Sequence, residues 1–289
     1  MSKRALMVLI IVGAGAIIVP PVQRSIEAEA GRARPTEEAL YLSADTLKRL
    51  SFGCEGVLAD LYWVRTVQYY GQRAFRPGRR FDLLEPLLDI ITTLDPQFQA
   101  AYRLGALFLA LPPPGGAGQP WRALALLDRG IAANPDEWRL ILDKGFIFLW
   151  ELRDYARAAD VFDRASRHPR APAWTKGLAA AVYVKAGRRE IARRLWLERY
   201  HQAENELMKK NAAFQLACLD ALEEIERLSG AVAQFRARHG RLPRSWDDLI
   251  ASGILTRHPV DPFGFPYVLD DKTAEVRLSS ESPIVLPRL

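Results

Sequence analysis

Three segments of this chain repeat one another at intervals near 34 residues, and this recurrence constrains the fold more than any other feature. The first two segments run from a small to a large apolar residue and then to a second small residue and a proline: Ala123, Leu127, Gly130 and Pro135, then Ala158, Phe162, Ala165 and Pro169. These intervals are 35, 35, 35 and 34 residues, and the first two positions return 34 residues later as Ala192 and Trp196. Small residues let helices approach closely, and proline ends a helix because it has no N–H to donate. The pattern predicts helices stacked in sequence, whose apolar faces only their neighbours can bury.

Apolar residues at helical spacing give the expected limits of the helices. The repeating region contains helices at residues 81–94, 97–111, 137–152, 155–166, 173–186 and 189–200. A Pro/Gly-rich insertion at residues 112–120 lengthens one interval between prolines to 39 residues, and we expect it to be an exposed loop. Helices also precede this region, and the one near residues 56–71 carries aromatic side chains that we interpret as core: Tyr62, Trp63, Tyr69 and Tyr70.

Residues 81–200 resemble the tetratricopeptide (TPR) superfamily of helical hairpin repeats. Residues 185–188 are similar to its tight turn between helices, and Gly145 lies within one residue of its small position in the first helix. The resemblance implies that the first helix of each pair lines a concave groove for a protein partner. Tyr102, Trp138 and Trp174, at intervals of 36 and 36 residues, begin these helices. They are candidate groove contacts, and packing between repeats is the favoured alternative.

The N-terminal residues predict a membrane segment. Lys3 and Arg4 precede an uncharged run at residues 5–22, whose 18 residues nearly span a hydrocarbon core of about 30 Å. Positive charge ahead of such a run keeps the N-terminus in the cytoplasm. We therefore expect a single-pass anchor in a bacterial inner membrane, with the rest of the chain in the periplasm. The alternatives are a secretory signal cleaved after Ala28 and Ala30, and a helix buried in a soluble fold.

The C-terminal region has a different order of elements. A long amphipathic helix at residues 205–239 leads to a turn at 240–243, a short helix at 245–251, a proline-rich loop at 259–267 and a hairpin that turns at 270–273. Over about 60 residues this order is similar to the C-terminal part of the major pseudopilins of type II secretion, although no prepilin peptidase site opens the chain. The resemblance implies a calcium ion at Asp261, Asp270 and Asp271, and turn and cap roles are the favoured alternative. We expect Tyr267 to be largely buried.

The sequence carries few signals for chemistry. No motif for a catalytic serine, a metalloprotease, a phosphate-binding loop or a dinucleotide site occurs, and the four histidines lie apart from one another. The net charge of +6 comes mainly from arginine, because only 8 of the 40 basic residues are lysine, and nucleic acid is not an expected partner. Cys54 and Cys218 have no metal-binding spacing; a disulfide and two free thiols both remain open, with free buried thiols favoured.

Together these features predict a mainly α protein, in which a TPR-like solenoid follows an N-terminal membrane helix and precedes a small α+β segment. The expected divisions are an anchor or signal at residues 1–23, a linker at 24–35, a helical cap at 36–80, the solenoid at 81–203 and the long helix with its hairpin at 204–289. The expected function is a non-catalytic scaffold that binds a protein partner in envelope assembly, secretion or a pilus-like machine. A docking subunit of a polysaccharide-synthesis or other enzyme complex is the alternative.

Overall fold

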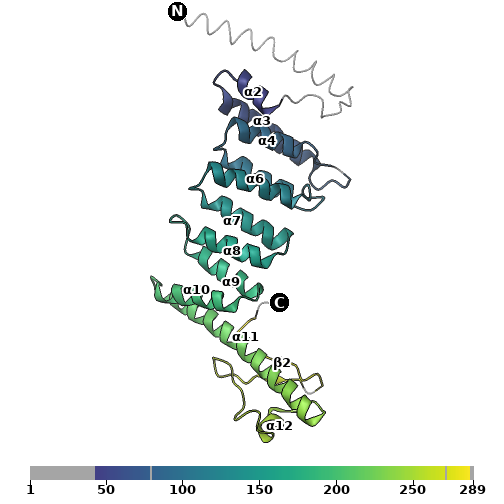
Figure 1. The fold of residues 1–289 in the computed structure, drawn as a ribbon, viewed down its shortest axis with the longest axis vertical. Coiled ribbons are helices and arrows are strands. Elements are labelled where there is room, and N and C mark those ends of the chain that lie inside the picture. The colour runs from purple at the N-terminus through teal and green to yellow at the C-terminus, as the bar shows by residue number, and fades with distance from the viewer. Residues whose placement is uncertain (1–42, 79, 271, 287–289) are drawn as a thin grey trace, which may run out of the picture. The chain divides into compact units, whose positions relative to one another are not determined.

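The computed structural model describes residues 43–78, 80–270 and 272–286, and these residues are mainly helical, as predicted (Figure 1). The predicted membrane segment and Asp271 lie outside them. Within the described residues, no helix combines the length and the apolar character needed to cross a membrane. The chain divides into two compact units between Gly118 and Gln119, a boundary that falls inside the predicted insertion.

The first unit contains α2 (Ala44–Leu50), α3 (Glu55–Arg73), α4 (Leu84–Leu94) and α5 (Gln99–Ala110). Both α2 and α3 pack on α4, which packs on α5. The predicted aromatic core lies here, because Trp63 packs against Phe98 and Phe108 with ring centroids 5.7 and 6.4 Å apart, and Tyr70 stacks on Phe108 at 3.7 Å.

The insertion is fastened to this first unit. Its prolines at 112–114 are exposed, as expected of a loop, but Gly116 is buried against the end of α5. The Tyr70 hydroxyl donates a hydrogen bond of 2.7 Å to the Gly115 carbonyl, and the Phe75 N–H donates one of 2.8 Å to the Pro114 carbonyl. The loop is therefore ordered and only partly exposed.

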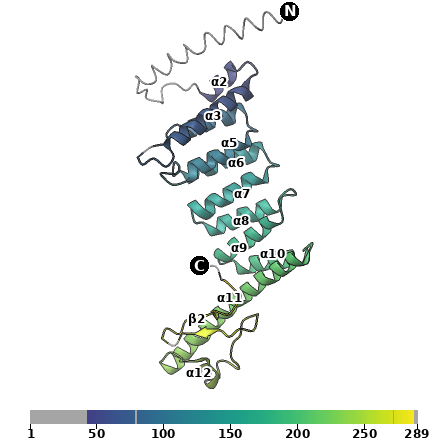
Figure 2. The same ribbon diagram turned by 180° about the vertical axis from the view of Figure 1, so that it is seen from behind.

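The second unit is built from helices that each pack on the next in sequence (Figures 1 and 2). They are α6 (Pro120–Ala133), α7 (Trp138–Phe146), the π-helix η2 (Ile147–Glu151), α8 (Tyr155–Ser166), α9 (Trp174–Lys185), α10 (Arg189–His201) and α11 (Glu206–His239). Three of the recurring small positions, Ala123, Ala158 and Ala192, are all 0% exposed.

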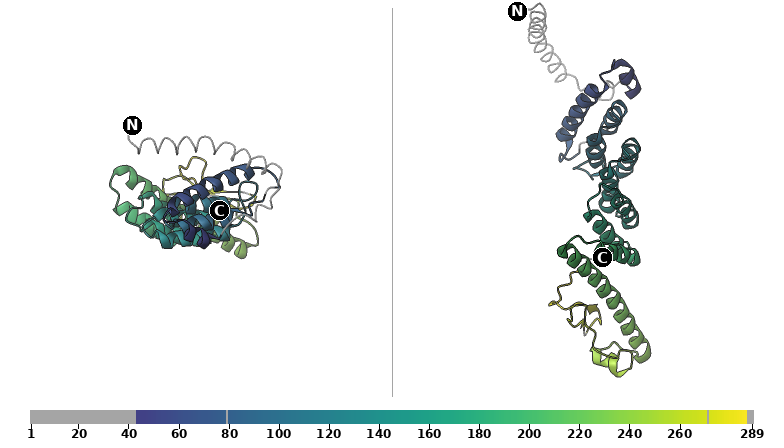
Figure 3. Two further views of the ribbon diagram at one scale, coloured as in Figure 1. Left: turned by 90° about the horizontal axis from the view of Figure 1, so that it is seen from above. Right: turned by 90° about the vertical axis from the view of Figure 1, so that its left-hand side faces the viewer.

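The last part of the second unit forms a module on α11 (Figure 3). Helix α12 (Trp246–Ala251) and a two-stranded antiparallel sheet of β1 (Val268–Leu269) and β2 (Val276–Arg277) pack against the C-terminal half of α11. The Trp246 indole N–H donates to the Tyr267 carbonyl at 2.8 Å. Tyr267 is 2% exposed, as predicted, and burial, followed by nearby acidic groups, raises its pKa to about 12. Its phenol therefore stays neutral at physiological pH.

Candidate functional site

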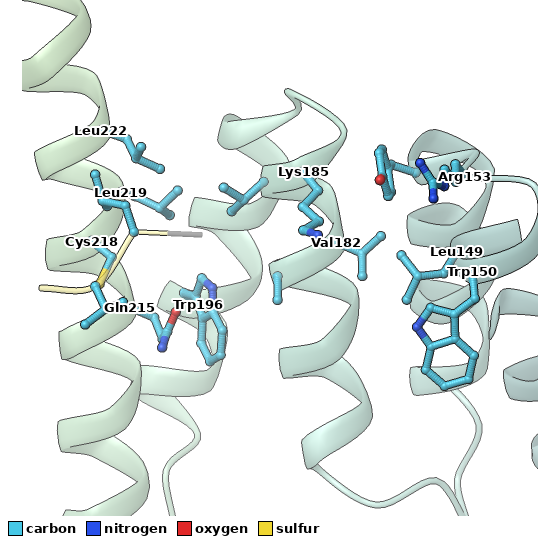
Figure 4. Close-up of a pocket in the computed structure, with 15 residues that line it drawn as sticks. Leu149, Trp150, Arg153, Val182, Lys185, Trp196, Gln215, Cys218, Leu219 and Leu222 are labelled. Atoms are coloured by element: carbon cyan, nitrogen blue, oxygen red, sulfur yellow. The ribbon is translucent and has the colours of Figure 1, made fainter. Parts of the chain in front are cut away.

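A pocket of about 650 Å³ lies in the second unit, between the end of η2, the C-terminal half of α9 and the middle of α11 (Figure 4). Its lining follows the repeat, because Leu149, Val184 and Leu219 recur at intervals of 35 residues and all contact the pocket. Equivalent positions of η2, α9 and α11 therefore form one surface. In this arrangement α11 takes the place of the first helix of a further pair.

The π-helix places an aromatic side chain at the edge of the pocket. From α8 to α10 the second-helix residues recur at 34 residues, as Ala158 and Ala192 do, whereas Gly145 and Ala180 of the first helices in the same two pairs are 35 residues apart. A π-turn absorbs an extra residue within a helix and commonly marks a functional position. Here it carries Trp150, which stacks on Phe146 at 4.4 Å and remains 63% exposed.

The floor of the pocket is apolar and closely packed. Val182, Trp196 and Leu222 are at most 7% exposed and contribute to it. Cys218 belongs to the same surface, and burial raises the pKa of its thiol. The thiol is therefore protonated at neutral pH, which suits packing better than nucleophilic attack or metal binding.

The rim of the pocket is cationic. Arg153 follows η2 with a left-handed backbone (φ 50°), and Lys185 ends α9 with its Nζ 5.4 Å from the centroid of the Tyr155 ring. Both side chains are exposed, and among the described residues neither forms an ion pair. No carboxylate or histidine occurs among the described residues that line the pocket. The lining is thus suited to bind an apolar group beside an anionic one.

The C-terminal segment of the described chain completes one side of the pocket through Val285 and Leu286. Ile284 is 5% exposed and packs with Cys218 and Ala221 on α11. The Ser282 hydroxyl donates to Asp261, which holds the start of this segment against the proline-rich loop. Val285 itself is 83% exposed.

The predicted groove residues do not line this pocket. Tyr102 is 2% exposed in α5 and Trp138 is 6% exposed in α7, so both serve the packing role that was the alternative. Trp174 is 50% exposed and meets Trp138 edge to face, with the ring centroids 6.3 Å apart. Sequence reasoning missed Trp150 and Lys185, although they are 35 residues apart and occupy equivalent ends of their helices. That interval was the signal that could have found them.

The aspartates proposed for calcium have structural partners. Oδ1 of Asp261, a residue 4% exposed, accepts hydrogen bonds from the N–H groups of Phe263 and Phe265 at 2.8 and 2.9 Å. Asp270 accepts from the N–H groups of the next turn, and Asp271 lies outside the described residues. In the part of the chain that the structure describes, no three His, Cys, Asp or Glu side chains come together as a metal site.

Comparison of the chain with models of known protein families and with curated proteins finds no match.

Proposed function

We propose that this protein is a non-catalytic TPR scaffold that binds a segment of another envelope protein in the pocket between η2, α9 and α11. Residues 5–22 anchor it in the inner membrane, and the remainder lies in the periplasm. The observation that carries the proposal is the pocket itself, because its lining recurs with the helical repeat. In TPR-like arrays the first helices of successive pairs present the binding surface.

The packing of the helices supports the assignment to this repeat class. A Cβ added to Gly145 would lie 2.5 Å from Phe162 of the following helix, and one added to Gly177 would lie 3.1 Å from Trp196. Each pair therefore joins a small residue in the first helix to the large recurring residue in the second. Gly145 and Gly177 are 32 residues apart, so the two glycines hold different positions of the repeat although each faces the recurring large residue.

The lining defines the class of segment that the pocket would hold. An apolar side chain fits the floor formed by Val182, Trp196 and Leu222. A carboxylate nearby would pair with Arg153 or Lys185, and opposite charge at a rim mainly adds specificity and speed of association. Trp150 offers an exposed aromatic ring of the kind enriched among residues that dominate binding energy. We therefore propose a segment of a protein partner that combines apolar residues with Asp or Glu.

The test is photocrosslinking of the full-length protein in intact cells, with p-benzoylphenylalanine in place of Trp150. We expect one dominant adduct, whose crosslinked segment, identified by mass spectrometry, contains apolar residues next to an acidic one. Lys185→Glu should strongly reduce the adduct. Lys272→Glu, at the exposed turn between β1 and β2, is the matched charge reversal and should leave it unchanged.

An adduct that survives Lys185→Glu at full yield would contradict the binding mode. So would an equal adduct from a photoprobe at Ala233, an exposed position on α11 that does not line the pocket.

A further inference from the structure

A second cavity of the second unit lies at the opposite end of α9 from the pocket described above. It has a volume of about 190 Å³ and lies between the last turns of α8 and α10 and the first turns of α9 and α11. None of its lining residues contributes to the first pocket. Most of them are polar: Ser166, Lys176, Arg199, Gln202 and Glu204.

Arg199 of α10 is held in this cavity by packing against α9. Its Cζ lies 5.5 Å from the centroid of the Trp196 ring, and a Cβ added to Gly177 would lie 3.7 Å from the same atom. Its Nη1 donates to the Ala173 carbonyl at the start of α9. The glycine therefore leaves the space in which the guanidinium lies, and the orientation of that planar group is fixed.

Much of the hydrogen-bonding capacity of this guanidinium is unused. The group carries five N–H donors, and its Nε is buried without an acceptor among the described residues. No carboxylate of the described chain pairs with it. Burial lowers the pKa of Arg199, but an arginine remains charged at neutral pH. A partly buried charge without a counter-ion costs free energy, and an anion in the cavity would offset that cost.

The two nearby glutamates do not serve as this counter-ion. Oε1 of Glu198 accepts a hydrogen bond of 2.6 Å from Nζ of Lys176, and this bond is the main cause that lowers the pKa of Glu198. Glu204 lines the cavity, but its side chain is exposed and forms no ion pair among the described residues. Lys176 keeps two further N–H donors. The lining therefore offers unused donors from two cationic side chains.

We infer that this cavity binds a small oxyanion, the chemistry shared by inorganic phosphate and a carboxylate, at Arg199 and Lys176. A guanidinium can donate two parallel hydrogen bonds to such a group. Pockets for drug-sized ligands measure about 300–1,000 Å³, so a cavity of about 190 Å³ suits a smaller group. Because this site shares no residue with the proposed partner pocket, it stands independently of the proposed function.

The experiment titrates sodium phosphate into the full-length chain in detergent at pH 7 by isothermal calorimetry, with sodium chloride keeping the ionic strength constant. We expect saturable binding that Arg199→Gln weakens by about tenfold or more, because a charge-assisted hydrogen bond is lost. Arg238→Gln, at an exposed arginine of α11 outside the cavity, is the matched control and should bind as the parent chain does. Sodium acetate distinguishes the two sources of the anion. Tighter binding of acetate would identify a carboxylate such as that of a partner's Asp or Glu, and tighter binding of phosphate would identify the free ion.

A titration without saturable heat for either anion would overturn the inference, and so would an affinity that Arg199→Gln leaves unchanged. Because Arg199→Gln removes packing as well as charge, Glu204→Gln tests the same site at an exposed position. Removal of this negative charge from the lining should tighten phosphate binding several-fold. An unchanged affinity in Glu204→Gln would place the anion elsewhere on the chain.

Discussion

At the scale of single residues, the glycines show where this protein has no room for a side chain. Gly145 faces Phe162 so closely that a methyl group would meet the ring at 2.5 Å. A Cβ added to Gly230, in the interior of α11, would meet no neighbouring group within 4 Å. The two glycines have the same intrinsic helix propensity, and only their surroundings differ.

This contrast predicts opposite effects for the same substitution. Gly230→Ala should raise the free energy of unfolding by about 0.5–1 kcal/mol, because alanine favours the helix. Gly145→Ala should lower it by about 1–3 kcal/mol, because the added methyl overpacks the contact with Phe162. Urea denaturation of the two variants measures both, and equal stabilisation would contradict the close approach.

The two cysteines are also distinguished by their surroundings. Both thiols are free; Cys54 is exposed, whereas Cys218 is buried and its pKa is raised by burial. At pH 8 we expect an aromatic disulfide reagent to modify Cys54 rapidly and Cys218 only after denaturant is added, because the thiolate is the reacting form. In the Cys54→Ser variant, the slow modification of Cys218 can be followed by itself. Rapid labelling of Cys218 in the native protein would show that its pocket opens readily.

Residue patterns revealed the core more fully than the pocket. The buried positions at Ala158, Phe162 and Ala192 follow directly from their spacing, since close helix packing demands these residue types. Trp150 was missed because its exposure depends on a π-turn. The spacing shows that an extra residue exists, but it does not show where the helix absorbs it.

At the scale of elements, the expected helices agree closely with the observed ones. The predicted helix at 155–166 is α8 (Tyr155–Ser166), whose start is capped by Asp154. The one at 205–239 is α11 (Glu206–His239), which is followed by Gly240 with φ 68°. The helix predicted at 137–152 is instead α7 continued by η2. The hairpin turns where alternation and Asp270 predicted, with Val268 opposite Arg277. Local signals fix helix ends, but the change of helix type depends on packing.

Asp261 organises the loop that joins α12 to the hairpin. Asp261→Ala should lower the free energy of unfolding by about 1–3 kcal/mol, because it leaves the N–H groups of Phe263 and Phe265 without their acceptor. Asp270→Ala, at an exposed turn, is the control and should cost less. Thermal melting measures both, and millimolar calcium should leave the melting temperature of the parent chain unchanged. A calcium-induced rise that Asp261→Ala abolishes would restore the metal site implied by the pseudopilin resemblance.

At the scale of the whole molecule, the proposed anchor makes location the first property to measure. The full chain should remain with membranes through high salt and carbonate, since about 18 apolar residues hold it far more strongly than surface charge. Its C-terminus should become accessible to protease once the outer membrane is opened, because Lys3 and Arg4 disfavour translocation of the N-terminus. Recovery of a soluble protein that begins near Gly31 would indicate a cleaved signal instead.

Helix α11 belongs to two packing systems at once. Gln215, Cys218, Leu219 and Leu222 line the pocket, whereas Leu228, Ala231, Val232 and Phe235 belong to the core under α12 and the sheet. Each helical residue adds a rotation of about 100°, so one residue inserted between Leu222 and Leu228 would turn one set of side chains away from its partners. Seven inserted residues would return them to within about 20°. The number of residues between Leu222 and Leu228 therefore fixes the directions in which the two sets of side chains point around α11. An insertion of seven residues would keep both sets packed, whereas an insertion of one would not.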